Sequence, residues 1–315
     1  DVPYYAENRD LPALPAPSHL VLYRDWHDAR IETARALAEV DVGIVTSYCP
    51  DAAAASALLL DSRVAIRCFY DLDTPVTLAR IARGEAVDYI PRGGLGGFDL
   101  VLSYTGGSAL AALRTQLGAR RVVPLYGSAD AAQHFPVAPV ARYRAALSYI
   151  GTYAVDRQAA LERLLVAPAR ARPEARFVIA GAQYPQDFPW APNIWFVRHL
   201  PPAEHPAFYS SSRLTLNVTR SAMARMGWCP SGRLFEAAAC GAAILSDAWE
   251  GLDAFFTPGE DILVAREPGD ALAAIELSDA EIARIARSGR ERTLDEHSAA
   301  RRASQMIDAF AMAEA

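Results

Sequence analysis

Short apolar runs alternate with helix-like stretches along almost the whole chain, and this alternation constrains the fold more than any other feature. Runs rich in β-branched and aromatic residues are typical of strands buried on both faces, and the intervening stretches have the length of crossover helices. The pattern therefore predicts α/β domains with parallel sheets. The expected strands span residues 19–24, 41–48, 64–71, 98–105, 121–127, 147–153, 176–181, 194–200, 213–219, 242–247 and 261–266.

The expected strands fall into two series, separated by the proline-containing segment "GSADAAQHFPVAPVAR". Such a break in periodicity is typical of a linker between domains. We expect two facing doubly wound, Rossmann-like domains, at 1–135 and 136–296, with ligands at the carboxyl ends of their strands. A helical tail is expected over about 278–313, and its end, 297–315, is predicted to pack back toward the first domain.

Composition and charge exclude several classes of protein. The 315 residues are 52% hydrophobic, which suffices for two domains with full cores, and the formal net charge of -6 argues against non-specific nucleic-acid binding. No apolar stretch has the length of a membrane span, and the first residues lack the basic and apolar regions of a signal peptide. We therefore predict a cytoplasmic protein without a transmembrane segment or a nucleic-acid partner.

The basic residues and the cysteines also limit the chemistry. All 31 residues counted as Lys or Arg are arginines, which excludes pyridoxal-phosphate enzymes, Schiff-base aldolases and the lysine-bearing phosphate loop. The four cysteines show no metal-ligand spacing with the scattered histidines, so we expect free thiols and no metal. His27 and His134 are interpreted as solvated or packed side chains.

The stretch "PSGRLFEAAACGAAILSD" (230–247) has the pattern of a short helix that begins near Ser231, ends at Gly241 and leads into a buried strand. On that helix, positions 233, 236, 237 and 240 share one face, so Arg233 and Glu236 are expected to emerge together. A carboxylate can accept hydrogen bonds from both hydroxyls of a ribose, while an arginine and a helix amino end suit a diphosphate. A surface ion pair between the two residues is the alternative.

Two other stretches resemble known motifs. The glycine run "PRGGLGGFDLVLSY" precedes a strand, whereas a dinucleotide fingerprint follows one, so we interpret it as a loop. In "FYDLDTP", Asp71 and Asp73 lie where a strand meets a turn, a place suited to a general base on the acceptor side. Capping of the following helix is an equally ordinary role for Asp73. We do not expect this DLD sequence to bind a metal.

Two phrases of the sequence resemble a known group of enzymes. "PLYGSADAAQHFPV" is similar to the linker of GT-B glycosyltransferases, and "RLFEAAACGAAILSD" resembles their nucleotide-sugar motif, closest to the CgeB-like glycosyltransferases. The resemblance is specific mainly over 148–264. It implies transfer of a sugar from a nucleoside diphosphate donor, most simply of the UDP type, to a glycan, a lipid-linked or a small-molecule acceptor. It implies no cofactor and no required metal.

The resemblance also implies a donor site in the second domain. An inverting reaction would need a base, for which Asp71 or Asp73 is the candidate, and Glu236 is implied to hold the ribose. Other roles stay open, because His199 can equally cap the chain and Arg220 can be solvated. The residues implied in donor binding are Gly151, Thr152, Tyr153, Arg157, Arg198, His199, Arg220, Ser231, Arg233 and Glu236.

Two departures from the group qualify this reading. Many retaining members carry an acidic residue eight positions before the helix glutamate, where this chain has Trp228. The chain also begins where the group has completed a first βα unit, which we expect to be missing. The alternatives are a sugar-nucleotide epimerase, a two-lobed ligand-binding protein, and a catalytically inactive nucleotide-binding protein. The sequence does not determine the oligomeric state.

Overall fold

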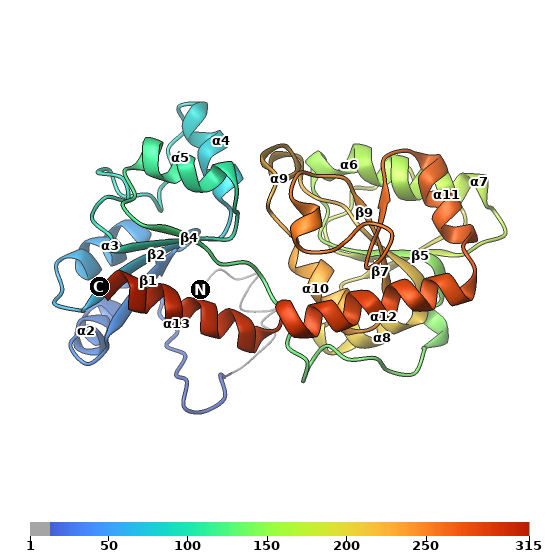
Figure 1. Ribbon diagram of the computed structural model, residues 1–315. Helices are drawn as coiled ribbons and strands as arrows, with labels where there is room; N and C mark the ends of the chain where they lie inside the picture. Colours follow the sequence, from blue (N-terminus) through green and yellow to red (C-terminus); the bar gives the residue numbers. More distant parts are fainter. Residues whose placement is uncertain (1–12, 315) are drawn as a thin grey trace. The chain divides into compact units, whose positions relative to one another are not determined.

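The computed structural model of the protein describes residues 13–314, which form two compact units (Figure 1). The first contains the described residues up to Tyr104, Ala109–Pro124 and those from Ile307 onward, and the second contains Thr105–Ser108 and Leu125–Met306. Each unit is built on its own parallel sheet. The predicted α/β fold with two parallel sheets is therefore confirmed.

The first unit has a four-stranded parallel sheet in the order β1-β2-β3-β4. Every side chain of β3 is buried, as expected for a central strand between two layers of helices. The strands are β1 (Val42–Thr46), β2 (Ile66–Asp71), β3 (Leu100–Ser103) and β4 (Val122–Pro124). The helices are α2 (Trp26–Leu37), α3 (Ala52–Leu60), α4 (Thr74–Ala82) and α5 (Ser108–Leu117).

The second unit has a six-stranded parallel sheet in the order β10-β9-β8-β5-β6-β7. The strand order reverses between β5 and β8, and in open α/β sheets ligands bind at the carboxyl ends of the strands at such a switch point. The strands are β5 (Ala145–Ile150), β6 (Phe177–Gly181), β7 (Ile194–Arg198), β8 (Ser212–Asn217), β9 (Ala243–Asp247) and β10 (Leu263–Ala265).

Helices cover both faces of this second sheet (Figure 1). Alternate strand residues enter different cores: Leu147 and Tyr149 of β5 pack in one cluster, and Ile150 packs in the other with the helix that carries Leu234. One layer contains α6 (Val155–Leu161), η2 (Glu162–Val166), α7 (Ala167–Ala171) and α11 (Pro268–Glu276). The other contains α8 (His205–Ser211), α10 (Gly232–Ala239) and α12 (Asp279–Glu296).

Four short helical segments complete the second unit. They are η1 (Ala141–Tyr143), η3 (Pro202–Glu204), α9 (Ser221–Met226) and η4 (Leu252–Ala254).

One expected strand is absent. Residues 19–24 form no strand, and Leu20, Val21 and Leu22 are exposed. An apolar run becomes a strand only when a neighbouring strand pairs with its backbone and a layer covers its side chains, and this segment has neither. The other ten expected strands are confirmed, each of them one to four residues shorter than predicted.

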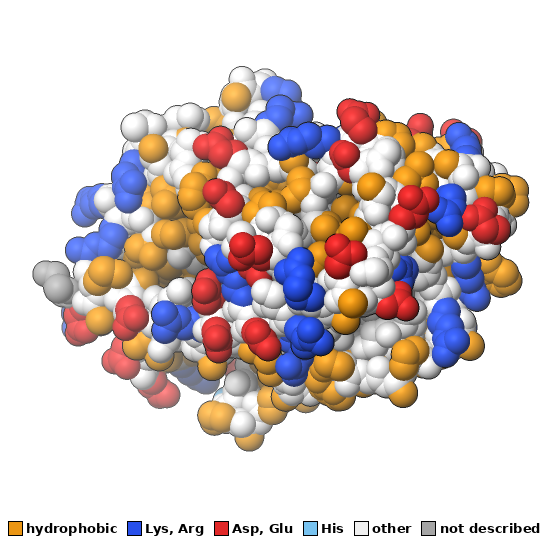
Figure 2. Space-filling model, turned by 45° about the vertical axis from the view of Figure 1, so that its right-hand side comes forward, with side chains coloured by type: hydrophobic (Ala, Val, Ile, Leu, Met, Phe, Trp, Pro, Cys, Tyr) orange, Lys and Arg blue, Asp and Glu red, His pale blue; other side chains and the backbone are white. Residues whose placement is uncertain are grey.

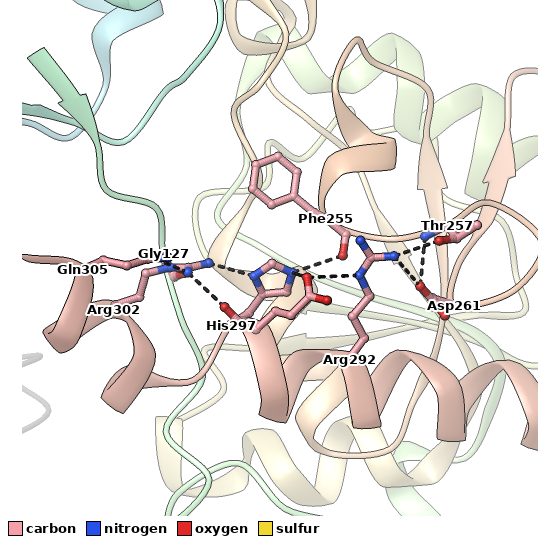
Figure 3. A network of polar contacts seen from close by, with 9 residues as sticks. Gly127, Phe255, Thr257, Asp261, Arg292, His297, Arg302 and Gln305 are labelled. Atoms are coloured by element: carbon pink, nitrogen blue, oxygen red, sulfur yellow. Dashed lines mark hydrogen bonds and ion pairs between the residues drawn. The ribbon is translucent and has the colours of Figure 1, made fainter.

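The predicted helical tail is interrupted at His297, where α12 ends and α13 (Ala299–Glu314) begins soon after. The buried imidazole of His297 lies 3.1 Å from the carbonyl oxygen of Phe255 through Nε2 and 2.8 Å from Nη2 of Arg302 through Nδ1 (Figure 3). These contacts fix the chain at the point where the helix direction changes. Packing of 297–315 against the first domain stays a prediction.

Two properties of the surface bear on function. None of the helices among residues 13–314 has the length and apolar character needed to span a membrane. Basic and acidic side chains are interspersed over the face shown in Figure 2. This mixture differs from the basic stripe that is typical of nucleic-acid-binding surfaces.

Candidate nucleotide-sugar site

The amino end of α10 is the centre of the candidate site. Leu234 and Phe235 are fully buried against the sheet, which fixes the rotation of the helix, and Arg233 and Glu236 are both half-buried. The prediction that these two side chains emerge on the same face is confirmed. Ala237 and Cys240 were predicted to share that face, but both are buried. Neighbouring segments cover more of this short helix than the pattern of its apolar residues indicates.

The guanidinium of Arg233 is held at the switch point of the sheet. Its Nη1 donates to Oδ1 of Asn217 over 3.1 Å and lies 3.4 Å from the hydroxyl of Ser231. Its guanidinium carbon lies 5.1 Å from the centre of the Tyr149 ring, a cation–π contact. Asn217 ends β8 and Tyr149 belongs to β5, so Arg233 lies over the two strands that define the switch point. Neutral groups thus orient the cation.

The alternative of a surface ion pair between Arg233 and Glu236 is wrong. Among the residues that the structure describes, one side chain near the Glu236 carboxylate that can become a cation is His205, whose Nδ1 lies 3.8 Å from Oε2 of Glu236. Nearby, burial raises the pKa of the Tyr209 hydroxyl well above its usual range, and the negative charge of Glu236 raises it further. The carboxylate of Glu236 is therefore available on its exposed side, with 30% of the side chain accessible.

The loop after β5 lies against Arg233. A Cβ atom on Gly151 would come within 2.9 Å of Nη2 of Arg233 and 2.7 Å of the Tyr149 hydroxyl, so only a glycine leaves this guanidinium in place. The Tyr184 hydroxyl donates to the carbonyl oxygen of Gly151 over 3.2 Å. At the end of β6, Gly181 has a φ of +151°, and a Cβ there would meet the same carbonyl at 2.1 Å. The loop is thus held close to the sheet from two sides.

A buried polar network lies under Arg233 at the ends of β8 and β9. The carboxylate of Asp247 accepts hydrogen bonds from the backbone N–H of Thr219 over 3.0 Å and from its hydroxyl over 2.9 Å. Nδ2 of Asn217 donates to the Ser246 hydroxyl over 3.0 Å, which leaves Oδ1 of Asn217 to face Arg233. Burial raises the pKa of Asp247, and the bonds from Thr219 oppose that rise.

Other predicted donor-site residues lie nearby in the chain but make separate contacts. Nη1 of Arg157 donates to the carbonyl oxygen of Thr152 over 3.3 Å, which closes the loop that also contains Tyr153. Nε of Arg220 lies 3.4 Å from Oδ2 of Asp156 at the start of α6, and the side chain keeps 36% of its surface exposed, so its role stays a prediction.

Arg198 ends the edge strand β7 and His199 follows it, and β5 and β6 lie between β7 and β8. Both side chains are exposed. His199 has a positive φ of 59°, and its backbone N–H donates to the carbonyl oxygen of Gly181 over 3.1 Å. His199 therefore turns the chain at the end of β7, and the structure does not bring these two side chains to Arg233 and Glu236.

In the first unit, Asp71 and Asp73 have different surroundings. Asp71 is fully buried, accepts from the hydroxyl of Thr77 over 3.1 Å, and has its pKa raised by burial. Asp73 is half-buried, and its Oδ2 accepts from the hydroxyl of Tyr48 over 2.8 Å. Asp73 precedes α4 without a side-chain capping bond, so the proposed capping role is wrong. Among the described residues, neither aspartate belongs to a group of potential metal ligands.

Several residues of the site were missed in the sequence. Asn217, Tyr149 and Tyr184 contact or flank Arg233, and only Asn217 carried a signal, as a polar residue near the end of an expected strand. His205 and Tyr209 approach Glu236 from α8, which no spacing in the sequence relates to α10.

Comparisons with known proteins concern the family and the fold of the chain. Residues 157–308, which include most of the second unit, match the family model described as glycosyl transferase-like. This part of the chain is similar to glycosyltransferase-like domains. Among curated proteins, no sequence gives a significant match.

Solved structures of similar fold include HepE and two synthases. HepE from Anabaena, in complex with UDP and glucose, has a TM-score of 0.67 at 14% identity, covering 93% of this chain and 84% of HepE. Sucrose-phosphate synthase from Thermosynechococcus elongatus has a TM-score of 0.63 at 14% identity, covering 94% of this chain and 81% of the synthase. The UDP-forming α,α-trehalose-phosphate synthase from Burkholderia vietnamiensis has a TM-score of 0.62 at 14% identity, covering 93% of this chain and 78% of the synthase. At such low identity these likenesses establish the fold, which is that of the GT-B glycosyltransferases.

Proposed function

We propose that the protein is a glycosyltransferase that moves a sugar from a nucleoside diphosphate sugar to an acceptor. The observation that carries the proposal is the presence of both Arg233 and Glu236, each with separate neighbours, on α10 at the switch point of the second sheet. A cation and a carboxylate at this place match the two chemically distinct parts of a nucleotide, its diphosphate and its ribose. The match of residues 157–308 to a glycosyl transferase-like family supports the same assignment.

Each group of the site receives a role in donor binding. Arg233 and the first backbone N–H groups of α10 hold the diphosphate, and the two oxygens of Glu236 accept from the 2′- and 3′-hydroxyls of the ribose. The Gly151–Tyr153 loop, with Arg157 and Arg220, lies on the phosphate side. Arg198 and His199 are assigned to the base side, at the edge strand.

The donor is proposed to be a UDP-sugar, because HepE, which shares the fold, was solved with UDP and with UDP-glucose. We also propose that the nearest sequence relatives are the CgeB-like enzymes, on the strength of the α10 motif. The acceptor is a glycan, a lipid-linked sugar or a small molecule.

In this reaction the bond between the anomeric carbon and the diphosphate oxygen breaks while the acceptor oxygen bonds to that carbon. The protein lowers the barrier by holding the donor in position and by stabilising the negative charge on the departing diphosphate with Arg233 and the helix amino end. These groups supply the charge that a metal ion supplies elsewhere, so we propose turnover without a metal. For an inverting reaction Asp73 is the better base, since Asp71 is inaccessible.

A thermal-shift panel tests the proposed function. A ligand that binds the folded state at a hundredfold excess over its Kd adds about 2.7 kcal/mol to the free energy of unfolding. We expect UDP and a UDP-sugar to raise Tm more than GDP or dTDP do, in buffer that contains EDTA. A panel in which no nucleoside diphosphate or nucleotide sugar raises Tm, at millimolar concentration, would contradict the proposal.

A further inference from the structure

His134, His205 and Glu236 meet at one place in the second unit, although they come from three separate segments. His134 lies in the segment after β4, His205 begins α8, and Glu236 is on α10. Each histidine offers one ring nitrogen and Glu236 offers one carboxylate oxygen. These three atoms all lie within 4.8 Å of one another. We refer to these three residues as the His–His–Glu cluster.

Two unsatisfied polar atoms accompany the cluster. Nδ1 of His134 is buried and has no hydrogen-bond partner, although the backbone N–H of the same residue donates to the carbonyl oxygen of Asp130 over 2.7 Å and fixes the loop. The hydroxyl of Tyr209, one turn after His205, is also buried without a hydrogen-bond partner. A buried polar atom left unpaired destabilises the folded chain, so a group that satisfies such an atom is bound favourably.

The donor set of the cluster is that of a transition-metal site. Two imidazole nitrogens and one carboxylate oxygen are the ligands of many three-residue zinc sites, which leave one position open to water. Metal–ligand bonds of about 2.0–2.2 Å require the three donor atoms to approach one another by roughly an ångström, which side-chain rotation supplies. His205 and Glu236 keep 20% and 30% of their side chains exposed, so an ion has access from solvent.

We propose that the His–His–Glu cluster binds one divalent transition-metal ion of the Zn²⁺ type. Bound there, the ion takes the carboxylate of Glu236 as a ligand and leaves it unable to accept the ribose hydroxyls. The metal is therefore an antagonist of donor binding and not a cofactor. This second part rests on the proposed function, whereas metal binding itself does not.

Titration of the full chain with ZnCl₂ in a non-chelating buffer at neutral pH tests the metal site. Calorimetry is expected to show one saturable site, and the absorption of bound Co²⁺ reports the geometry. His134→Asn and His205→Asn should each weaken zinc binding at least about tenfold. Loss of a residue that only hydrogen-bonds to a metal ligand already costs about that much affinity, and loss of a ligand itself costs more. His27→Asn, which alters an exposed histidine on α2, is the matched control and should bind as the unaltered chain does.

Far-ultraviolet circular dichroism checks that each variant is folded. Because His134 and His205 lie in separate segments, the two histidine variants test the site separately. Binding by both variants at the unaltered affinity would overturn the proposal, as would the absence of a saturable site. Repeating the zinc titration with UDP present separates the two proposals. Weaker zinc binding in UDP supports the shared carboxylate. Normal one-site zinc binding that UDP does not affect keeps the metal site and removes Glu236 from the ribose.

Discussion

Arg233 and Glu236 lie three positions apart on α10, yet different groups hold them. Neutral partners, Asn217 and the Tyr149 ring, orient the guanidinium, whereas the carboxylate lies near His205. A cation held by neutral groups keeps its full charge for an anionic ligand. The two residues should therefore contribute to the binding of different parts of a nucleotide.

Arg233→Met tests this division of roles. Methionine retains much of the apolar stem but removes the charge, so the diphosphate loses charge-assisted hydrogen bonds worth about 1.5–3 kcal/mol. We expect UDP affinity to fall roughly ten- to a hundredfold, while the affinity for uridine, which has no phosphate, stays within about twofold. Calorimetric titration with both ligands measures this. An equal loss for uridine and UDP would assign Arg233 a structural role.

Gly151→Ala tests the approach of the β5 loop to Arg233. A Cβ at 2.9 Å from Nη2 of Arg233 and 2.7 Å from the Tyr149 hydroxyl is too close for an ordinary contact, so we expect the guanidinium to shift away from this loop. UDP affinity should fall about five- to thirtyfold, from a loss of roughly 1–2 kcal/mol in hydrogen bonding. Gly269→Ala is the matched control, since a Cβ on Gly269 has open space around it. Similar UDP affinity in both alanine variants would show that Arg233 does not need this position.

Among the elements, the junction of α12 and α13 depends on a buried imidazole (Figure 3). Burial lowers the pKa of His297 to about 4, while the bond to the Phe255 carbonyl oxygen opposes that shift. In the folded state Nδ1 accepts from Arg302, so Nε2 carries the proton and the ring is neutral. Nearby, Nη1 of Arg292 pairs with Oδ2 of Asp261 at 2.9 Å and anchors α12 to the rest of the unit.

The pKa of His297 predicts a loss of stability in acid. The unfolded chain takes up a proton near the ordinary pKa of about 6.5, whereas the folded chain does so only near about 4, so stability falls as the pH drops between these values. The free energy of unfolding should decrease by about 3 kcal/mol across this window. His297→Gln, measured by urea melts at the same pH values, should lack this component. A parallel pH dependence in both proteins would contradict the assignment.

The expected strands show which parts of the two sheets the local sequence pattern predicts. Ten of the eleven expected strands are confirmed, because their apolar runs are bounded by turn residues and each run pairs with a neighbouring strand. The run at 19–24 has a similar pattern but no neighbour, and a neighbour in a sheet is a property of distant sequence. The helix break at His297 was missed for the same reason, since Phe255 and Arg302 create it.

For the whole molecule, sequence predicted the fold class and the one helix that centres the site. Helical spacing was enough to place Arg233 and Glu236 on a common face. The strand order β10-β9-β8-β5-β6-β7 was not predictable from spacing, and this order is what brings Asn217 and Tyr149 together under Arg233. The His–His–Glu cluster was missed too, because its three segments meet only in the folded chain.

The central claim, that Glu236 holds the ribose of a nucleotide sugar, is tested most directly by calorimetric titration of Glu236→Gln with UDP. EDTA is included so that no metal competes for the carboxylate. Glutamine keeps the shape but replaces one acceptor by a donor, which mismatches at least one ribose hydroxyl. Glu291→Gln, on the exposed face of α12, is the matched control.

We expect Glu236→Gln to weaken UDP binding by about 1–3 kcal/mol, or roughly five- to a hundredfold. The free energy of unfolding from urea melts should change by no more than about 0.5 kcal/mol, as is usual for a partly exposed side chain. Glu291→Gln should bind UDP as the unaltered chain does. Equal UDP affinities for the unaltered chain and Glu236→Gln would contradict the assignment of this site to a nucleotide sugar.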